Sequence, residues 1–227
     1  MTQLLAAITV FLATHLIPAY RPLRNRLVAM LGEKVYLIAY SGLSLAVTVW
    51  LGYAFFATPY VELWPYAPWT RWFPILIMPL ACILLVAGIT SPNPMSLGWG
   101  SKGFSPSTPG IVAVSRHPAI WGLILWSASH LPTNGDAAGL LLFGLLTLLG
   151  LSGPYSLDHK RRQRLGEARW SELAAQTSTV PFVAALVGRT RISPAEIGWS
   201  RILGGLALYV AFLWLHEPVI GLDPLAF

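Results

Sequence analysis

Charged residues and cysteine are what this sequence has least of. Only 11% of its 227 residues are charged, whereas 55% are hydrophobic and the mean hydropathy is +0.62. Soluble domains carry about 25% charged residues, so this composition excludes an ordinary soluble protein. The single cysteine, Cys82, lies inside an apolar run. One buried thiol excludes both a disulfide framework and a cysteine metal site.

Acidic residues are also scarce. The chain has 9 Asp and Glu against 15 Lys and Arg, which gives a net charge of +6. In a soluble protein this excess would suggest nucleic acid as a partner, but in so apolar a chain the positive-inside rule explains it, and we expect no nucleic-acid partner. The N-terminus lacks a basic n-region and a small-residue cleavage site. The first apolar run is therefore predicted to be a retained span and not a signal peptide.

Six apolar stretches approach the length of about 20 residues that a transmembrane helix needs. They are about Leu4–Ala19, Tyr36–Phe56, Trp72–Ile89, Pro118–Leu131, Ala137–Leu151 and Ile202–Leu215. The predicted fold class is therefore all-α, a polytopic transmembrane helical bundle of about six spans in the lipid bilayer, with residues 1–227 forming one membrane domain. Asp136 is interpreted as the N-cap of the fifth span. The charged segment at about 157–175 is predicted to form a helix along the cytoplasmic membrane surface.

The basic residues indicate an orientation for these spans. Fourteen of the 15 Lys and Arg fall in the connections after the first, third and fifth spans, and only Arg71 lies on the other side. The positive-inside rule then places those three connections in the cytoplasm and both termini outside. The other side is rich in aromatic residues such as Tyr60, Trp64, Tyr66 and Trp69, which are typical of a membrane interface.

The five histidines separate by depth under this topology. His15, His117 and His159 lie near the cytoplasmic ends of spans, whereas His130 and His216 lie near the outer ends. His117 and His130 are thirteen residues apart, about 20 Å along a helix axis, and cannot share a metal. His15 and His117 lie at one depth on different spans. They are therefore candidate metal ligands, as an axial pair for a haem iron.

Residues near this histidine pair are candidates for the rest of a haem site. Trp121, one turn beyond His117, would wall the porphyrin, while Arg21, Arg24 and Arg116 would meet its propionates. The sequence spacing of these residues also allows an alternative to a haem site. In that alternative the histidines bond backbone carbonyls or lipid headgroups, and the arginines form a positive-inside cluster with snorkelling side chains.

Residues spread along the chain carry a resemblance to a known family. They are His15, Pro18, Arg21, Arg24, Gly32, Tyr36, Tyr40-Ser41, Ser44-Leu45, Arg116-His117-Pro118, Trp121, Leu125-Trp126, His130-Leu131 and Asn134-Gly135-Asp136. With these residues nearly the whole chain resembles the NnrU family of bacterial integral membrane proteins. The resemblance implies a multi-pass protein of the bacterial inner membrane that serves nitrite and nitric oxide metabolism in denitrification.

The NnrU family is in turn similar to the 15-cis-zeta-carotene isomerases of plants and cyanobacteria. Those membrane enzymes carry haem b, and their histidine ligation changes with the redox state of the iron. His15, just ahead of an arginine at a span end, and His117 in the Arg-His-Pro motif match their histidines. The resemblance therefore implies haem b as cofactor, His15 and His117 as iron ligands, and a small or lipophilic ligand. An isomerase-like activity is implied too, while catalysis itself stays open.

A second resemblance leads to a different enzyme class. Membrane isoprenylcysteine and phospholipid methyltransferases also carry Arg-His-Pro, followed by a Glu-rich helix. This chain departs from their pattern, because Asp158 stands near their glutamate and Arg169 takes the place of their tyrosine. The resemblance implies that His117 and Asp158 would face S-adenosylmethionine and that Arg161 or Arg162 would bind its carboxylate. A third alternative is a non-catalytic assembly or signalling partner of nitric oxide respiration.

Overall fold

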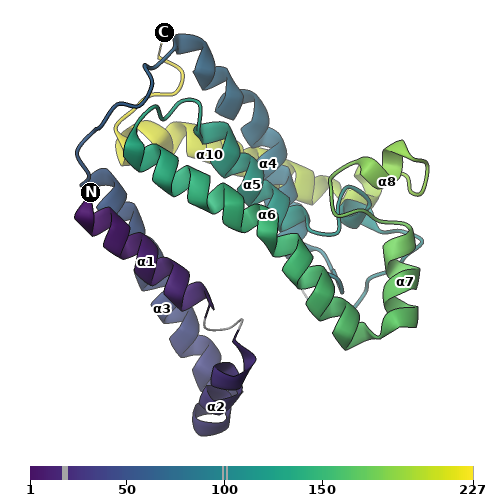
Figure 1. Cartoon of the computed structure of the whole chain (residues 1–227). Helices are drawn as coiled ribbons and strands as arrows, with labels where there is room; N and C mark the ends of the chain where they lie inside the picture. The colour runs from purple at the N-terminus through teal and green to yellow at the C-terminus, as the bar shows by residue number, and fades with distance from the viewer. Residues whose placement is uncertain (17–19, 99, 101, 227) are drawn as a thin grey trace. The chain divides into compact units, whose positions relative to one another are not determined.

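The computed structural model describes residues 1–16, 20–98, 100 and 102–226. The helices are α1 (Thr2–Leu16), α2 (Arg21–Leu31), α3 (Glu33–Phe56), η1 (Pro68–Arg71), α4 (Trp72–Thr90), η2 (Gly110–Ala113), α5 (Pro118–His130), α6 (Ala137–Leu165), α7 (Glu167–Ala175), α8 (Val183–Leu186), α9 (Pro194–Ile197) and α10 (Trp199–Ile220) (Figure 1). Among the described residues, β pairing is limited to an isolated bridge between Glu62 and Asp136. The predicted all-α class is confirmed. Pro18 and Ala19, which the sequence prediction used, lie outside the described residues.

The number of full-length spans differs from the prediction. Each predicted stretch contains a helix, but four segments of the described chain are long and apolar enough to cross a membrane: α3, Pro68–Thr90, α6 and α10. The helices α1 and α5 have 15 and 13 residues. At 1.5 Å per residue they extend only about 20 Å, short of the roughly 30 Å hydrocarbon core. The predicted six spans are therefore corrected to about four helices of full membrane-spanning length.

The predicted surface helix is divided at Gly166. The α6 helix continues to Leu165, Gly166 takes a φ of +78°, and α7 begins at Glu167. Arg162 donates two hydrogen bonds of 2.6 Å to Glu167 across this break, and the pairing lowers the pKa of that carboxyl. With 29 residues, α6 is about 43 Å long, so its charged last turns extend beyond the hydrocarbon core.

The chain divides into two compact units. The first unit comprises Met1–Pro65 and Gly135–Leu142, and the second comprises Tyr66–Asn134 and Phe143–Phe227. In the first unit α1 packs against α3 (Figure 1). The buried residues of α1 include Leu4, Ala7 and Phe11, whose spacing of three and four places them on one helix face.

A turn at the start of α6 also belongs to the first unit. Leu63 and Trp64 both donate backbone hydrogen bonds to the carbonyl of Gly135, at 2.8 and 3.0 Å. Asp136 accepts hydrogen bonds from the amides of Ala138 and Gly139, so its predicted role as the N-cap of α6 is confirmed. The connection after α3 and the beginning of α6 therefore lie together on one side of the membrane.

In the second unit α4 packs against both α5 and α10. Small residues allow these close approaches, as is common between membrane helices. A Cβ atom on Gly122 of α5 would lie 2.7 Å from the carbonyl oxygen of Ala81, and one on Gly205 of α10 would lie 2.5 Å from the Cα of Ile83. Side chains at these two glycines would force the helices apart.

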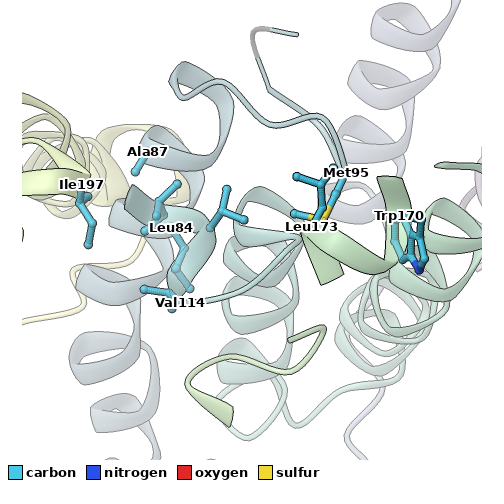
Figure 2. Close-up of a cluster of buried hydrophobic side chains, with 9 residues drawn as sticks. Leu84, Ala87, Met95, Val114, Trp170, Leu173 and Ile197 are labelled. Carbon is cyan, nitrogen blue, oxygen red and sulfur yellow. The ribbon is translucent and has the colours of Figure 1, made fainter. Parts of the chain in front are cut away.

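A buried apolar cluster lies beside the C-terminal end of α4 (Figure 2). It includes side chains from α4, the 91–115 loop, η2, α7 and α9. Its members are Leu84, Ala87, Met95, Ile111, Val112, Val114, Trp170, Leu173 and Ile197. Because the loop after α4 supplies several members, its two ends pack against the helices, whereas the described residues 97–98, 100 and 102–103 between them are exposed. This packing fixes the segment that leads into Arg116 and His117.

Candidate functional site

His117 occupies a fully buried position at the start of α5, with 0% of its surface exposed. It is the N-cap residue, with φ −122° and ψ 55°, and Pro118 follows as the first helical residue. Proline is favoured at that position and disfavours helical geometry in the residue before it. The backbone amide of His117 donates to the Ser115 hydroxyl at 3.1 Å. The Arg-His-Pro sequence thus holds His117 outside the helix, in the protein interior.

Both ring nitrogens of His117 have partners. Nδ1 lies 2.8 Å from the hydroxyl of Ser96, and Nε2 lies 2.8 Å from Oδ1 of Asp158. An ionised carboxylate only accepts hydrogen bonds, so we assign the proton to Nε2, which donates to Asp158. Nδ1 then accepts the hydroxyl proton of Ser96. The imidazole is thereby fixed in one tautomer and one orientation.

Asp158 also joins His117 to Arg116. Its Oδ2 accepts hydrogen bonds from Nη2 of Arg116 at 3.0 Å and from the hydroxyl of Thr179 at 3.1 Å. Arg116 donates a second hydrogen bond to Thr179 at 2.7 Å. We call Ser96, Arg116, His117, Asp158 and Thr179 the His117 centre. It joins the loop after α4, the start of α5, the polar end of α6 and the segment after α7.

Further hydrogen bonds hold the backbone around this centre. The Asn93 side chain donates to the carbonyl of Arg116 at 2.9 Å. The carbonyl of Thr179 accepts from the Ser115 hydroxyl at 2.7 Å and from Nε1 of Trp121 at 2.8 Å. Trp121, predicted as a porphyrin wall, therefore anchors the 176–182 segment in this structure.

His15 lies in the first unit and has a different environment. Its Nδ1 donates to the carbonyl of Phe11 at 2.8 Å, while Nε2 lies 3.5 Å from the hydroxyl of Ser44 on α3. A ring whose Nδ1 proton bonds a carbonyl presents Nε2 as its basic nitrogen, which is the usual arrangement of a metal-ligating histidine. Arg24 lies 3.6 Å from Glu33, and its guanidinium is 5.6 Å from the ring centroid of Tyr36.

The predicted site residues fall into two groups. His15, Arg21 and Arg24 belong to the first unit, whereas Arg116, His117 and Trp121 belong to the second. The second group is brought together around Asp158 and Thr179. The pairing of His15 with His117 across the units stays a prediction.

The two histidines differ as haem ligands. His15 is the better candidate, because its unprotonated Nε2 has only a 3.5 Å contact with the Ser44 hydroxyl. His117 does not fit in the arrangement described, because its ring is fully buried, its unprotonated Nδ1 accepts from Ser96 at 2.8 Å and its Nε2 proton bonds Asp158. The Arg116 guanidinium donates hydrogen bonds of 2.7 to 3.4 Å to Asp158, Thr179 and Thr177. These bonds direct it to protein groups and not toward a haem propionate.

The three remaining histidines have local partners, and the ring of His159 lies 2.9 Å from the side-chain amide of Gln163, one turn further along α6. His130 donates from Nδ1 to the carbonyl of Trp126 at 2.7 Å, and its ring stacks on Phe143 at 5.3 Å between centroids. His216 donates to the carbonyl of Leu222 at 2.7 Å. In the part of the chain that the structure describes, no group of three or more His, Cys, Asp or Glu side chains could hold a metal ion.

Ser96 and Thr179 are members of the centre that sequence reasoning missed. Each is a single hydroxyl residue in a connecting segment, separated from His117 or Arg116 by 21 and 63 positions. No local pattern distinguishes them from neighbouring serines and threonines. Sequence reasoning identified Asp158 only through the resemblance to the membrane methyltransferases.

Comparison with known proteins agrees with the predicted family. The NnrU protein family matches residues 3–224. An 83-residue stretch is 30% identical to the chloroplastic 15-cis-zeta-carotene isomerase of Zea mays; it covers 37% of this chain but only 22% of that protein. No solved structure matches. Because the family match extends over nearly the whole chain, this membrane protein belongs to the NnrU family.

Proposed function

We propose that this protein binds haem b and serves nitrite or nitric oxide metabolism in a bacterial inner membrane. The observation that supports haem binding is the orientation of His15, whose Nδ1 proton bonds the Phe11 carbonyl and leaves Nε2 as the basic nitrogen. When bound, haem supplies an iron that binds small ligands and changes oxidation state. Isomerase-like chemistry on a lipophilic ligand belongs to the same proposal, supported by the partial similarity to the maize enzyme.

The proposed orientation has both termini on the outer side and the basic connections in the cytoplasm, which requires the shorter helices α1 and α5 also to pass from one side to the other. The bonds from Leu63 and Trp64 to Gly135 support it, because they join two connections that the charge pattern assigns to the outer side. The basic end of α6, with Arg161, Arg162 and Arg164, lies at the opposite end of that helix.

The proposal gives different roles to the two predicted ligands. His15 would hold the haem iron, and Arg21 and Arg24 would bind the haem propionates. His117 keeps its proton on Nε2 and orders the connections around it through Ser96 and Asp158. It would be available as a second iron ligand only without its hydrogen bond to Asp158.

An absorption spectrum tests this proposal. The full chain is purified in detergent after expression with supplied haem, together with His15→Ala and the matched control His216→Ala. We expect a Soret band in the native protein and in His216→Ala, and its loss in His15→Ala. A native protein without a Soret band, or an unchanged band in His15→Ala, would refute haem binding at His15.

The contacts of the His117 centre also favour a second candidate, a methyltransferase-like enzyme. Asp158 contacts His117 directly, and Arg161 donates to the carbonyl of Ser96 at 3.0 Å, so residues expected at the S-adenosylmethionine site lie together. Titration calorimetry with S-adenosylmethionine tests it. This candidate predicts saturable binding that Asp158→Ala abolishes and Glu172→Ala retains. A protein that binds neither cofactor and co-purifies with a respiratory nitric oxide enzyme would instead be a non-catalytic partner.

A further inference from the structure

The α2 helix is basic and has no buried residue. Its sequence RPLRNRLVAML contains three arginines and no acidic residue. Of its apolar residues, Met30 is 79% exposed and Leu31 47% exposed. A short helix without a buried face gains little from packing inside the protein. A surrounding medium must therefore cover its apolar side chains.

The residues of α2 separate into two faces. At about 100° per residue, Leu23, Leu27, Met30 and Leu31 share one sector of about 100°. Arg26 lies at one border of that sector and Arg24 at the other, and Arg21 lies on the opposite face. An apolar strip bordered by arginines is the pattern of a helix that lies in the membrane interface.

The position of α2 in the first unit agrees with an interfacial location. Gly32, with φ +78°, ends α2, and α3 begins at Glu33 (Figure 1). Because α3 is long enough to span a membrane, its first residue lies near the membrane surface. The break at Gly32 stops α2 from continuing that span, so the apolar strip can face acyl chains beside the start of α3.

The charge around α2 indicates which lipids would be bound. Arg21, Arg24, Arg26 and Lys34 supply four positive charges, and Glu33 supplies one negative charge. Arg24 is already paired with Glu33 at 3.6 Å. Arg21 and Arg26 are exposed. Arg26 borders the apolar strip, and Arg21 lies on the polar face, from which its long side chain can reach the headgroup layer. Together they complement phosphate headgroups of lipids whose acyl chains cover the strip.

We propose that α2 lies in the membrane interface and binds the headgroups of anionic phospholipids through Arg21 and Arg26, with Arg24 at the border of its apolar strip. The proposal does not require bound haem, but it shares Arg21 with the proposed haem site, so lipid binding is measured on protein grown without supplied haem. The lipid anchors the segment between α1 and α3 and thereby stabilises the surroundings of His15.

Native mass spectrometry of the full chain tests this proposal. Protein in a zwitterionic detergent is titrated with phosphatidylglycerol or with phosphatidylcholine, and bound lipid is counted. We expect the native protein to prefer phosphatidylglycerol. Each arginine near an anionic surface contributes about fivefold in affinity, so Arg21→Gln with Arg26→Gln should weaken phosphatidylglycerol binding on the order of tenfold or more. Phosphatidylcholine binding should be unchanged.

Two further variants make the result specific to α2. Arg21→Lys with Arg26→Lys keeps the charge and should keep the lipid preference. Arg164→Gln with Arg191→Gln removes two exposed cations elsewhere and should also keep it. Absence of a preference in the native protein would overturn the proposal. An equal loss in the Arg164 and Arg191 variant would also overturn it, since binding would then follow net charge alone.

Discussion

Nε2 of His117 donates a 2.8 Å hydrogen bond to Asp158, a residue 41 positions later on the polar end of α6. The same carboxylate accepts from Arg116 and Thr179. A single side chain therefore partners both the imidazole and the guanidinium of the Arg-His-Pro motif. This links α5 to the part of α6 that extends beyond its apolar run.

Asp158→Asn should destabilise the protein. It leaves Arg116 without its counter-charge, and the single amide oxygen of asparagine cannot replace the two carboxylate oxygens that accept from His117, Arg116 and Thr179. The expected loss is on the order of 2 kcal/mol, since breaking a partly buried charge pair is costly. Thermal unfolding in detergent measures it. Glu172→Gln, which breaks an exposed pair with Arg169, is the control and should cost less than about 1 kcal/mol. Equal losses in the two variants would contradict the assigned role of Asp158.

The variant His117→Ala tests whether His117 has a structural role or is an iron ligand. Because both nitrogens are bonded within the protein, we expect lower thermal stability and a haem content within about twofold of the native level. Absorption spectra of the oxidised and reduced protein measure the outcome. A change in iron coordination in this variant would show that His117 leaves Asp158 to bind iron.

Neighbouring glycines on α10 test the packing of α4. A Cβ on Gly205 would lie 2.5 Å from the Cα of Ile83, whereas one on Gly204 would lie 3.5 Å from a side-chain atom of Val86. Gly205→Ala should therefore destabilise by about 1–3 kcal/mol, because backbone must move. Gly204→Ala should be neutral or slightly stabilising, since alanine favours helix. Similar unfolding temperatures for the two variants would contradict the α4–α10 contact.

Gly166→Ala tests the break between α6 and α7. The φ of +78° costs an L-residue about 1–2 kcal/mol, and no atom within 4 Å would oppose a Cβ there. The loss of stability in Gly166→Ala should therefore come from backbone strain alone. Gly153→Ala is the control, because that glycine is inside α6 with only ordinary contacts to Ile120. Thermal unfolding compares the two, and an unchanged stability for Gly166→Ala would argue against the break.

The sequence predicted the helices better than the site. The predicted ends at Phe56, Trp72, Pro118 and Ala137 coincide with helix ends in the structure, because proline and the limits of apolar runs mark them. The prediction ended the fifth span at Leu151, since glycine and proline follow at Gly153 and Pro154 and were expected to stop the helix. The α6 helix instead includes Pro154 and continues to Leu165, until Gly166 permits a positive φ.

The candidate site was only partly predictable for a different reason. Arg116 and His117 were identified from a motif with proline at a helix start. Their partners Ser96 and Thr179 come from connections whose folding depends on the packing of Met95, Val114 and neighbouring residues. Such long-range contacts leave no periodic pattern in the chain. The hydrogen bonds at both nitrogens of His117 could not be predicted for the same reason.

The most direct test of the account is the Soret absorbance of purified full-length protein, compared between the native chain and His15→Ala after growth with supplied haem. Because the Phe11 carbonyl holds the Nδ1 proton of His15, Nε2 is the nitrogen available to iron. We therefore expect a haem b spectrum in the native protein and in His216→Ala, and its loss in His15→Ala. A native protein that carries no haem, or equal haem content in His15→Ala, would contradict the account.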